Sequence, residues 1–147
     1  MDERKFQENV MKMRYLEQQA RQVEQQIGVL ERVLTSVIIS QGALKDLKNS
    51  DKSDGLFPLG SGVYVKGKVT DSKNVLVDVS AGTLVSKTLE EAAEFLKEKE
   101  EQLKNGIASQ QSIMNDIQGG YSATGEEMQK MQEQAKTQTA QTKKPGK

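Results

Sequence analysis

The 147-residue sequence contains no cysteine, no histidine and no tryptophan. Without cysteine, the chain has no disulfide, thiol nucleophile or zinc–thiolate site. Without histidine, it lacks the commonest general base and the commonest metal ligand. Only carboxylate chemistry remains, and no phosphate-binding loop, nucleophile elbow or cluster of metal ligands accompanies it. We therefore expect no enzyme, no cofactor and no metal site.

Charge of one sign and long apolar runs are also lacking. Lys+Arg and Asp+Glu each number 21, so the formal net charge is zero and there is no general basic face for nucleic acid. Four lysines lie within residues 136–147, but no aromatic residue accompanies them, so nucleic-acid binding is a weak alternative. No apolar run approaches the ~18 residues of a membrane span, and the first residues lack a signal peptide's apolar segment. We expect a cytoplasmic protein with no membrane or nucleic-acid partner.

Residues 1–48 carry a heptad repeat. Apolar residues spaced alternately three and four apart over five heptads are typical of a coiled coil. As one helix, residues 6–48 would span roughly 65 Å at ~1.5 Å per residue. That exceeds the diameter of about 40 Å expected of a compact chain of this length, so the helix must project. The a and d positions are Phe6, Asn9, Met13, Leu16, Ala20, Val23, Ile27, Leu30, Leu34, Val37, Gln41 and Leu44.

A second helix is expected over residues 89–135, where Thr88 and Glu91 form the T-x-x-E capping box that starts it. Its seam is less regular, with a stutter at Leu103 and Ile107. Glycines at 119 and 120 each cost a helix about 1 kcal/mol relative to alanine, so we expect bending or fraying over residues 119–125. Residues 136–147 read as a disordered basic tail. The remaining positions of the seam are Leu89, Ala92, Leu96, Lys99, Gln110, Met114, Ile117, Tyr121, Thr124, Met128, Met131 and Ala135.

Between the helices, residues 49–88 change from a period of about 3.5 to a period of two. This pattern predicts four short strands over residues 56–59, 63–69, 75–79 and 83–86, arranged as two hairpins. Residues 71–74 read as a four-residue hairpin loop, and residues 80–82 as a turn. The fold class is therefore α+β, a long antiparallel helical hairpin with two β-hairpins between its helices.

This layout has physical consequences at both ends of the helical hairpin. The small sheets leave open edges and valine-rich faces at its base, so we expect assembly through added strands. At the far tip, helical turns near both termini bring four of the six methionines together. Methionine suits promiscuous apolar binding. Val10 and Met11 lie outside the seam and favour a binding role, whereas seam packing explains Phe6, Met13, Met128 and Met131 equally well.

Three segments resemble the alpha class of archaeal-type prefoldin: residues 58–66 (PLGSGVYVK), 77–82 (VDVSAG) and 90–96 (EEAAEFL). The resemblance implies a hexamer of two alpha and four prefoldin beta subunits, with a double β-barrel platform and six projecting coiled coils. Prefoldins of this class capture unfolded client proteins without ATP and deliver them to a group II chaperonin. Beta subunits have one hairpin between the helices, so two hairpins favour alpha. Ser80, where the family often has glycine, and the glycines near 119–125 depart from the pattern.

The resemblance also assigns roles to individual positions. It implies a client-binding tip made of Phe6, Val10, Met11, Met13, Met128 and Met131. It implies that the subunits assemble through Phe57, Leu59, Val63, Val65, Val75, Val77, Val79, Leu84 and Val85. The alternative to a chaperone that holds unfolded clients is a prefoldin-like adaptor, which scaffolds other proteins and needs no apolar tip.

Overall fold

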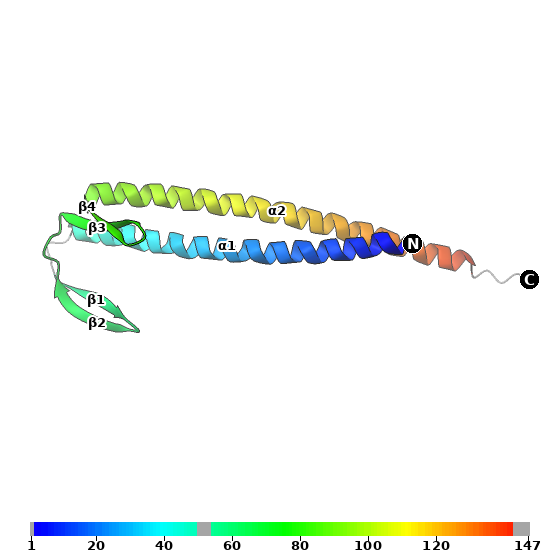
Figure 1. Ribbon diagram of the computed structural model, residues 1–147, viewed down its shortest axis with the longest axis horizontal. Helices are drawn as coiled ribbons and strands as arrows, with labels where there is room; N and C mark the ends of the chain where they lie inside the picture. Colours follow the sequence, from blue (N-terminus) through cyan, green and yellow to red (C-terminus); the bar gives the residue numbers. More distant parts are fainter. Residues whose placement is uncertain (1, 50–53, 143–147) are drawn as a thin grey trace, which may run out of the picture. The chain divides into compact units, whose positions relative to one another are not determined.

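The computed structural model describes residues 2–49 and 54–142, in which two helices precede and follow two β-hairpins along the chain (Figure 1). The order helix, four strands, helix is the α+β arrangement that the sequence predicts. Residues 50–53 of the expected middle segment and 143–147 of the expected tail lie outside the described residues. The elements are α1 (Glu3–Asn49), β1 (Asp54–Gly60), β2 (Val63–Lys68), β3 (Asn74–Ser80), β4 (Thr83–Thr88) and α2 (Leu89–Thr142).

The chain divides into two units, and the first comprises residues 1–30 and 106–147. Within it, the ammonium of Lys5 lies 2.9 Å from the carboxylate of Glu127. Farther along α1, the side chain of Leu16 lies against Gly120. Leu30 in turn lies against Gly106. Residue numbers on α2 therefore decrease as those of their neighbours on α1 increase. In this unit the two helices are therefore antiparallel neighbours.

The second unit comprises residues 31–105 and contains both hairpins. Here the amide of Gln41 donates a 2.8 Å hydrogen bond to the carboxylate of Glu100. About two helical turns farther along α1, Lys48 approaches Glu90 at 4.0 Å. The same antiparallel order of α1 and α2 thus holds within this unit.

The buried side chains form a narrow seam rather than a broad core. Every buried residue in the described chain occupies a position that the heptad pattern assigns to one of the two seams. Thr124 is the most enclosed, with an exposed fraction of 2%. A seam of single residues at intervals of three and four is the packing expected of a coiled coil. The buried residues are Asn9, Val23, Val37, Leu89, Ala92, Ile117 and Thr124.

Both helices begin at side-chain caps. The predicted capping box is confirmed, because the Glu91 amide donates to the Thr88 hydroxyl at 3.2 Å and the Thr88 amide donates to the Glu91 carboxylate at 3.1 Å. At the start of α1, the Lys5 amide donates to the Asp2 carboxylate at 3.3 Å. Each cap satisfies amides that have no partner within the first helical turn.

The strands form two separate antiparallel two-stranded sheets, β1–β2 and β3–β4. The two hairpins are built alike, since each has a register irregularity just before its turn. Each turn also has two successive residues with positive φ, Ser61 and Gly62 in the first and Ala81 and Gly82 in the second. Two positive φ angles are typical of the primed turns whose twist matches that of paired strands.

The prediction that residues 71–74 form a hairpin loop is wrong, because β2 and β3 belong to different sheets. The Asp71 carboxylate instead accepts hydrogen bonds from the Lys73 amide at 2.9 Å and the Asn74 amide at 3.1 Å. The Lys73 carbonyl accepts the amide of Leu89 at 3.3 Å. This segment therefore links the two hairpins and connects to the start of α2.

The second helix is longer and more regular than expected. It continues through the glycine-rich residues 119–125, where we expected fraying, and on to Thr142, well into the segment expected to be disordered. Gly120 packs against Leu16, which occupies a seam position of α1. The hydroxyl of Thr124 donates to the Gly120 carbonyl at 2.8 Å within this stretch. Seam contacts thus hold the helix across residues of low helical propensity.

By length and composition alone, α1 is able to cross a membrane, since it contains an 18-residue window of mean hydropathy 1.4. The window is apolar on average although the sequence has no long uninterrupted apolar run. A coiled-coil helix with a continuous apolar seam meets the same criterion, so this measure by itself does not identify a membrane segment. In both units α1 lies along α2.

Two of the helical glycines lead to a stability prediction. A β-carbon added at Gly119 or Gly125 would meet nothing within 4 Å. Each substitution by alanine should raise the free energy of unfolding by about 1 kcal/mol, because alanine loses less backbone entropy in a helix. Urea denaturation followed by circular dichroism would measure the change.

Gly82→Ala is the matched control, because Gly82 has a φ of +87° that a side chain disfavours. This substitution should lower stability. If Gly119→Ala and Gly125→Ala lowered the free energy of unfolding as much as Gly82→Ala does, the packing described for α2 would be wrong.

Candidate functional site

We define the tip as residues 3–14 of α1 and 124–134 of α2, which lie in the same unit. The six residues predicted to bind clients all fall within it. Met11 is the most open of them, with an exposed fraction of 72%. The other five, Phe6, Val10, Met13, Met128 and Met131, are half-buried. The tip therefore presents apolar side chains that the seam covers only in part.

A polar residue lies in the middle of this apolar end. Asn9 occupies a d position and is buried, and its amide nitrogen lies 4.0 Å from the Met131 sulfur. The sequence places it in the α1 seam as one of that helix's two polar exceptions, together with Gln41, which pairs with Glu100. A polar residue at a seam position favours the one register in which its partner is within reach.

An ion pair joins the two helices beside Asn9. The Lys5 ammonium hydrogen-bonds the Glu127 carboxylate and lowers the pKa of that carboxyl, with a smaller contribution from Asn9. The same contact raises the pKa of Lys5. Twelve positions farther along α1, the Tyr121 hydroxyl donates to the Glu17 carboxylate at 3.0 Å, which raises the pKa of Tyr121. These contacts connect the outer faces of the helices at the edge of the seam.

A groove of about 500 Å³ lies along one flank of α1 within the tip. Phe6, Val10 and Met11 supply its apolar surface, which brings three of the six predicted residues into one site. Met13, Met128 and Met131 do not line it. Methionine content alone therefore did not identify the groove, whereas the observation that Val10 and Met11 lie outside the seam pointed to it. The lining residues are Glu3, Phe6, Gln7, Val10, Met11 and Arg14.

The hairpins form the second candidate surface. Of the residues predicted to take part in assembly, Val75 and Val77 are half-buried and the other seven are exposed. Phe57 pairs with Val65 across the first hairpin, and Val77 pairs with Val85 across the second. Residues directly opposite each other share a face, so each hairpin presents an apolar pair on one side.

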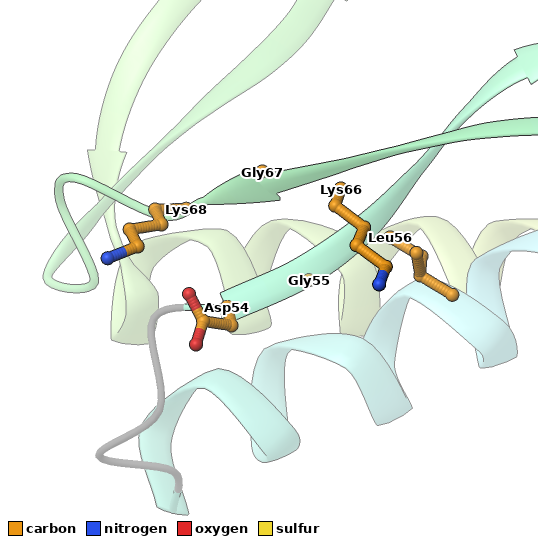
Figure 2. A pocket seen from close by; sticks show the side chains of 6 residues that line it. All are labelled: Asp54, Gly55, Leu56, Lys66, Gly67 and Lys68. Carbon is orange, nitrogen blue, oxygen red and sulfur yellow. The ribbon is translucent and has the colours of Figure 1, made fainter.

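In the first hairpin, two glycines accommodate an aromatic ring. A β-carbon at Gly67 would lie only 2.8 Å from the Phe57 ring, and one at Gly55 would lie 3.5 Å from it. The ring thus covers the paired glycines and remains 41% exposed. A groove of about 580 Å³ runs across the same strands, lined by Asp54, Gly55, Leu56, Lys66, Gly67 and Lys68 (Figure 2).

Apart from Leu84, the exposed apolar residues on the opposite strand faces were not predicted from the sequence. Leu56, Tyr64 and Leu76 are all exposed, although none was among the predicted assembly residues. The same alternation that placed the valines on one face puts these residues on the other. Both faces of each hairpin therefore carry exposed apolar side chains, and one covering layer would not bury them all.

Comparison with known proteins decides the family of the chain. A family model described as prefoldin subunit matches residues 16–134. The chain belongs to the prefoldin family. Prefoldins are chaperone subunits rather than enzymes, and they form oligomeric complexes with other prefoldin subunits.

Archaeal prefoldin alpha subunits are among the relatives of this prefoldin. The chain is 27% identical to prefoldin subunit alpha of Methanobrevibacter smithii over 86% of its own length and 88% of that protein. It is 31% identical to prefoldin subunit alpha 1 of Thermococcus kodakarensis over 67% of its length and 68% of that protein. The expected resemblance to the archaeal alpha class is confirmed.

A solved structure of filamentous prefoldin from Methanocaldococcus jannaschii is similar in fold. The TM-score is 0.69 at 21% sequence identity, covering 77% of this chain and 94% of that one. The likeness confirms the prefoldin fold, with two long helices and two small hairpins between them.

The contact between Lys5 and Glu127 leads to a pH prediction. Because the pKa of Glu127 is lowered, its stabilising effect is present above 4.5, the usual value, and is lost as pH falls through the folded pKa. The effect of Lys5 is present below 10.5 and is lost as pH rises through its raised pKa. Titration of the Glu127 carboxyl carbon by NMR should give a midpoint below 4.5.

Lys5→Gln should move that midpoint up toward the usual value, because the charged partner is gone. Arg4→Gln is the control, since Arg4 pairs with Glu8 on its own helix at 3.3 Å. Identical Glu127 midpoints in wild-type and Lys5→Gln would show that the two helices do not meet in this way.

Proposed function

We propose that this chain is an alpha-type subunit of a cytoplasmic prefoldin hexamer of two alpha and four beta subunits. In this proposal the complex captures unfolded polypeptides at its coiled-coil tips without ATP and passes them to a group II chaperonin. The observation that carries the proposal is the apolar surface exposed on the hairpins and in the tip groove, where Met11 has an exposed fraction of 72%.

Assembly is supported by the state of the hairpins. A two-stranded sheet is marginal by itself, and each of these has apolar residues exposed on both faces. Each hairpin also has strand edges with unpaired backbone groups, which neighbouring strands are able to extend. Burying one valine or leucine side chain contributes roughly 1.5–3 kcal/mol. Several such side chains per subunit would hold a platform together.

Client capture is supported by the flank of α1. Val10 and Met11 have no place in the seam, so packing between the helices does not account for them. The groove they line with Phe6 is open to solvent on a helix whose other outer residues are mainly charged or polar. Flexible methionine next to a half-buried aromatic residue is suited to apolar segments of varied sequence.

The second candidate function is that of a prefoldin-like adaptor that scaffolds folded partners. It uses the same hairpin platform and does not need the tip groove. The exposed methionine at the tip favours the chaperone, and substitutions in the groove separate the two functions.

The proposed capture of clients leads to a prediction about client binding. Replacing Val10 and Met11 by serine should weaken binding of an unfolded client roughly tenfold or more, because each apolar side chain contributes about 1.5 kcal/mol or more when covered. Suppression of the aggregation of a denatured client by the reconstituted complex, without nucleotide, would measure the loss. Native mass spectrometry would check that the complex still assembles.

Ile39→Ser is the matched control for this double substitution. Ile39 lies on the same helix outside the tip and has an exposed fraction of 68%. It should leave suppression unchanged. If the complex with Val10→Ser and Met11→Ser protects clients as well as wild-type does, the adaptor becomes the better reading.

The proposed platform leads to a prediction about assembly of the hexamer. Val77→Asp would place a carboxylate on a strand face that the platform covers, at a cost of several kcal/mol. Size-exclusion chromatography with beta subunits should then show free or aggregated subunits in place of the hexamer. Val77→Ile keeps the β-branched apolar side chain and should still assemble. An unaltered hexamer with Val77→Asp would overturn the assignment of this face.

A further inference from the structure

The tip groove has a charge at each end. Glu3 lies at the start of the groove and Arg14 at its far end, with Phe6, Val10 and Met11 between them. The two charged residues are eleven positions apart, which corresponds to about 16 Å along a helix. The groove is therefore apolar in its middle, acidic at one end and basic at the other.

Neither charge has a partner within the part of the chain that the structure describes. Four other charged residues of the tip are paired, Arg4 with Glu8 at 3.3 Å and Lys5 with Glu127 at 2.9 Å. The side chains of Glu3 and Arg14 take part in none of the ion pairs or side-chain hydrogen bonds found among residues 2–49 and 54–142. Both therefore remain available to a ligand in the groove.

The local structure accounts for one of these charges but not for the other. Glu3 lies in the first turn of α1, where a carboxylate interacts favourably with the helix dipole. Arg14 lies about three turns inside α1, too far from either end to interact with the helix dipole. Its nearest acidic neighbour toward the C-terminus, Glu17, accepts the hydrogen bond of Tyr121 from the other helix. The Arg14 guanidinium therefore lies beside Val10 and Met11 without an ion-pair partner among the described residues.

We propose that this groove selects client segments in which a few apolar residues separate one basic and one acidic residue. The inference rests on the proposed function of the tip and names the chemistry that the tip prefers. The apolar middle supplies the affinity, and the two end charges supply the preference. An extended chain advances about 3.3 Å per residue, so the charges of a fitting segment stand about five residues apart.

The test uses four extended, fluorescently labelled peptides that share a core of four apolar residues. Their end residues are Lys and Glu, Lys and Lys, Glu and Glu, or Gln and Gln. The assembled complex containing the full chain should bind the Lys–Glu peptide roughly three- to tenfold more tightly than the Lys–Lys or Glu–Glu peptide at low salt, since two exposed ion pairs contribute modestly. The difference should shrink in 0.5 M salt, roughly as screening predicts.

Two variants should switch the preference. Glu3→Lys makes both ends of the groove basic, so the Glu–Glu peptide should become the tightest ligand. Arg14→Glu makes both ends of the groove acidic, so the Lys–Lys peptide should then become the tightest ligand. This design does not depend on the direction in which a peptide lies. Lys12→Glu is the matched control, because it reverses an exposed charge of the tip that does not line the groove.

The outcomes separate this inference from the proposed function. If all four peptides bind equally and the variants change nothing, the selection of charged ends is wrong while apolar capture at the tip stands. If no peptide binds, the inference also fails. The proposed function fails as well only if the serine variants of Val10 and Met11 still leave protection of clients unchanged.

Discussion

The narrow seam between α1 and α2 is the interaction on which the rest of this structure depends. In each unit it buries single residues at heptad spacing, such as Val23 and Ile117 in one and Val37 and Ala92 in the other. A seam of this width covers only the sides of the helices that face each other. Every apolar residue on another face stays in contact with water unless a second molecule covers it. The exposed apolar residues of this chain are therefore the places at which to look for partners.

Two groups among those residues, on the hairpins and at the tip, differ in character, while others such as Ile38 and Ile39 lie along α1 outside both. The hairpin residues are valines, leucines and aromatic residues that project from both faces of short paired strands, which suits permanent burial in an assembly. The tip residues lie along one flank of a single helix and include the flexible side chain of Met11. A surface of this second kind suits reversible contact with many sequences. In the proposed function, the hairpins assemble the complex and the tip contacts clients.

Much of the fold was predictable, because its signals are local and repetitive. The heptads identified both helices and every buried position, and the Thr88–Glu91 box identified the first residue of α2. Strand pairing was less accessible. Residues 71–74 have the composition of a hairpin loop, but the hydrogen bonds of Asp71 close them into a link between two sheets. Composition also suggested that α2 would fray at its glycines, whereas the contact of Gly120 with Leu16 is tertiary and invisible in propensities.

The candidate site shows the same division between local pattern and tertiary contact. The sequence by itself determined that Val10 and Met11 lie outside the seam and that valines alternate along the strands, because both follow from a fixed helical or strand period. Only the tertiary structure decided which charges of the tip are available. Lys5 and Glu17 are engaged because residues more than a hundred positions away, Glu127 and Tyr121, reach them from the other helix. Glu3 and Arg14 have no such neighbour, and no pattern within a single helix distinguishes a charge that meets a partner across the seam from one that does not.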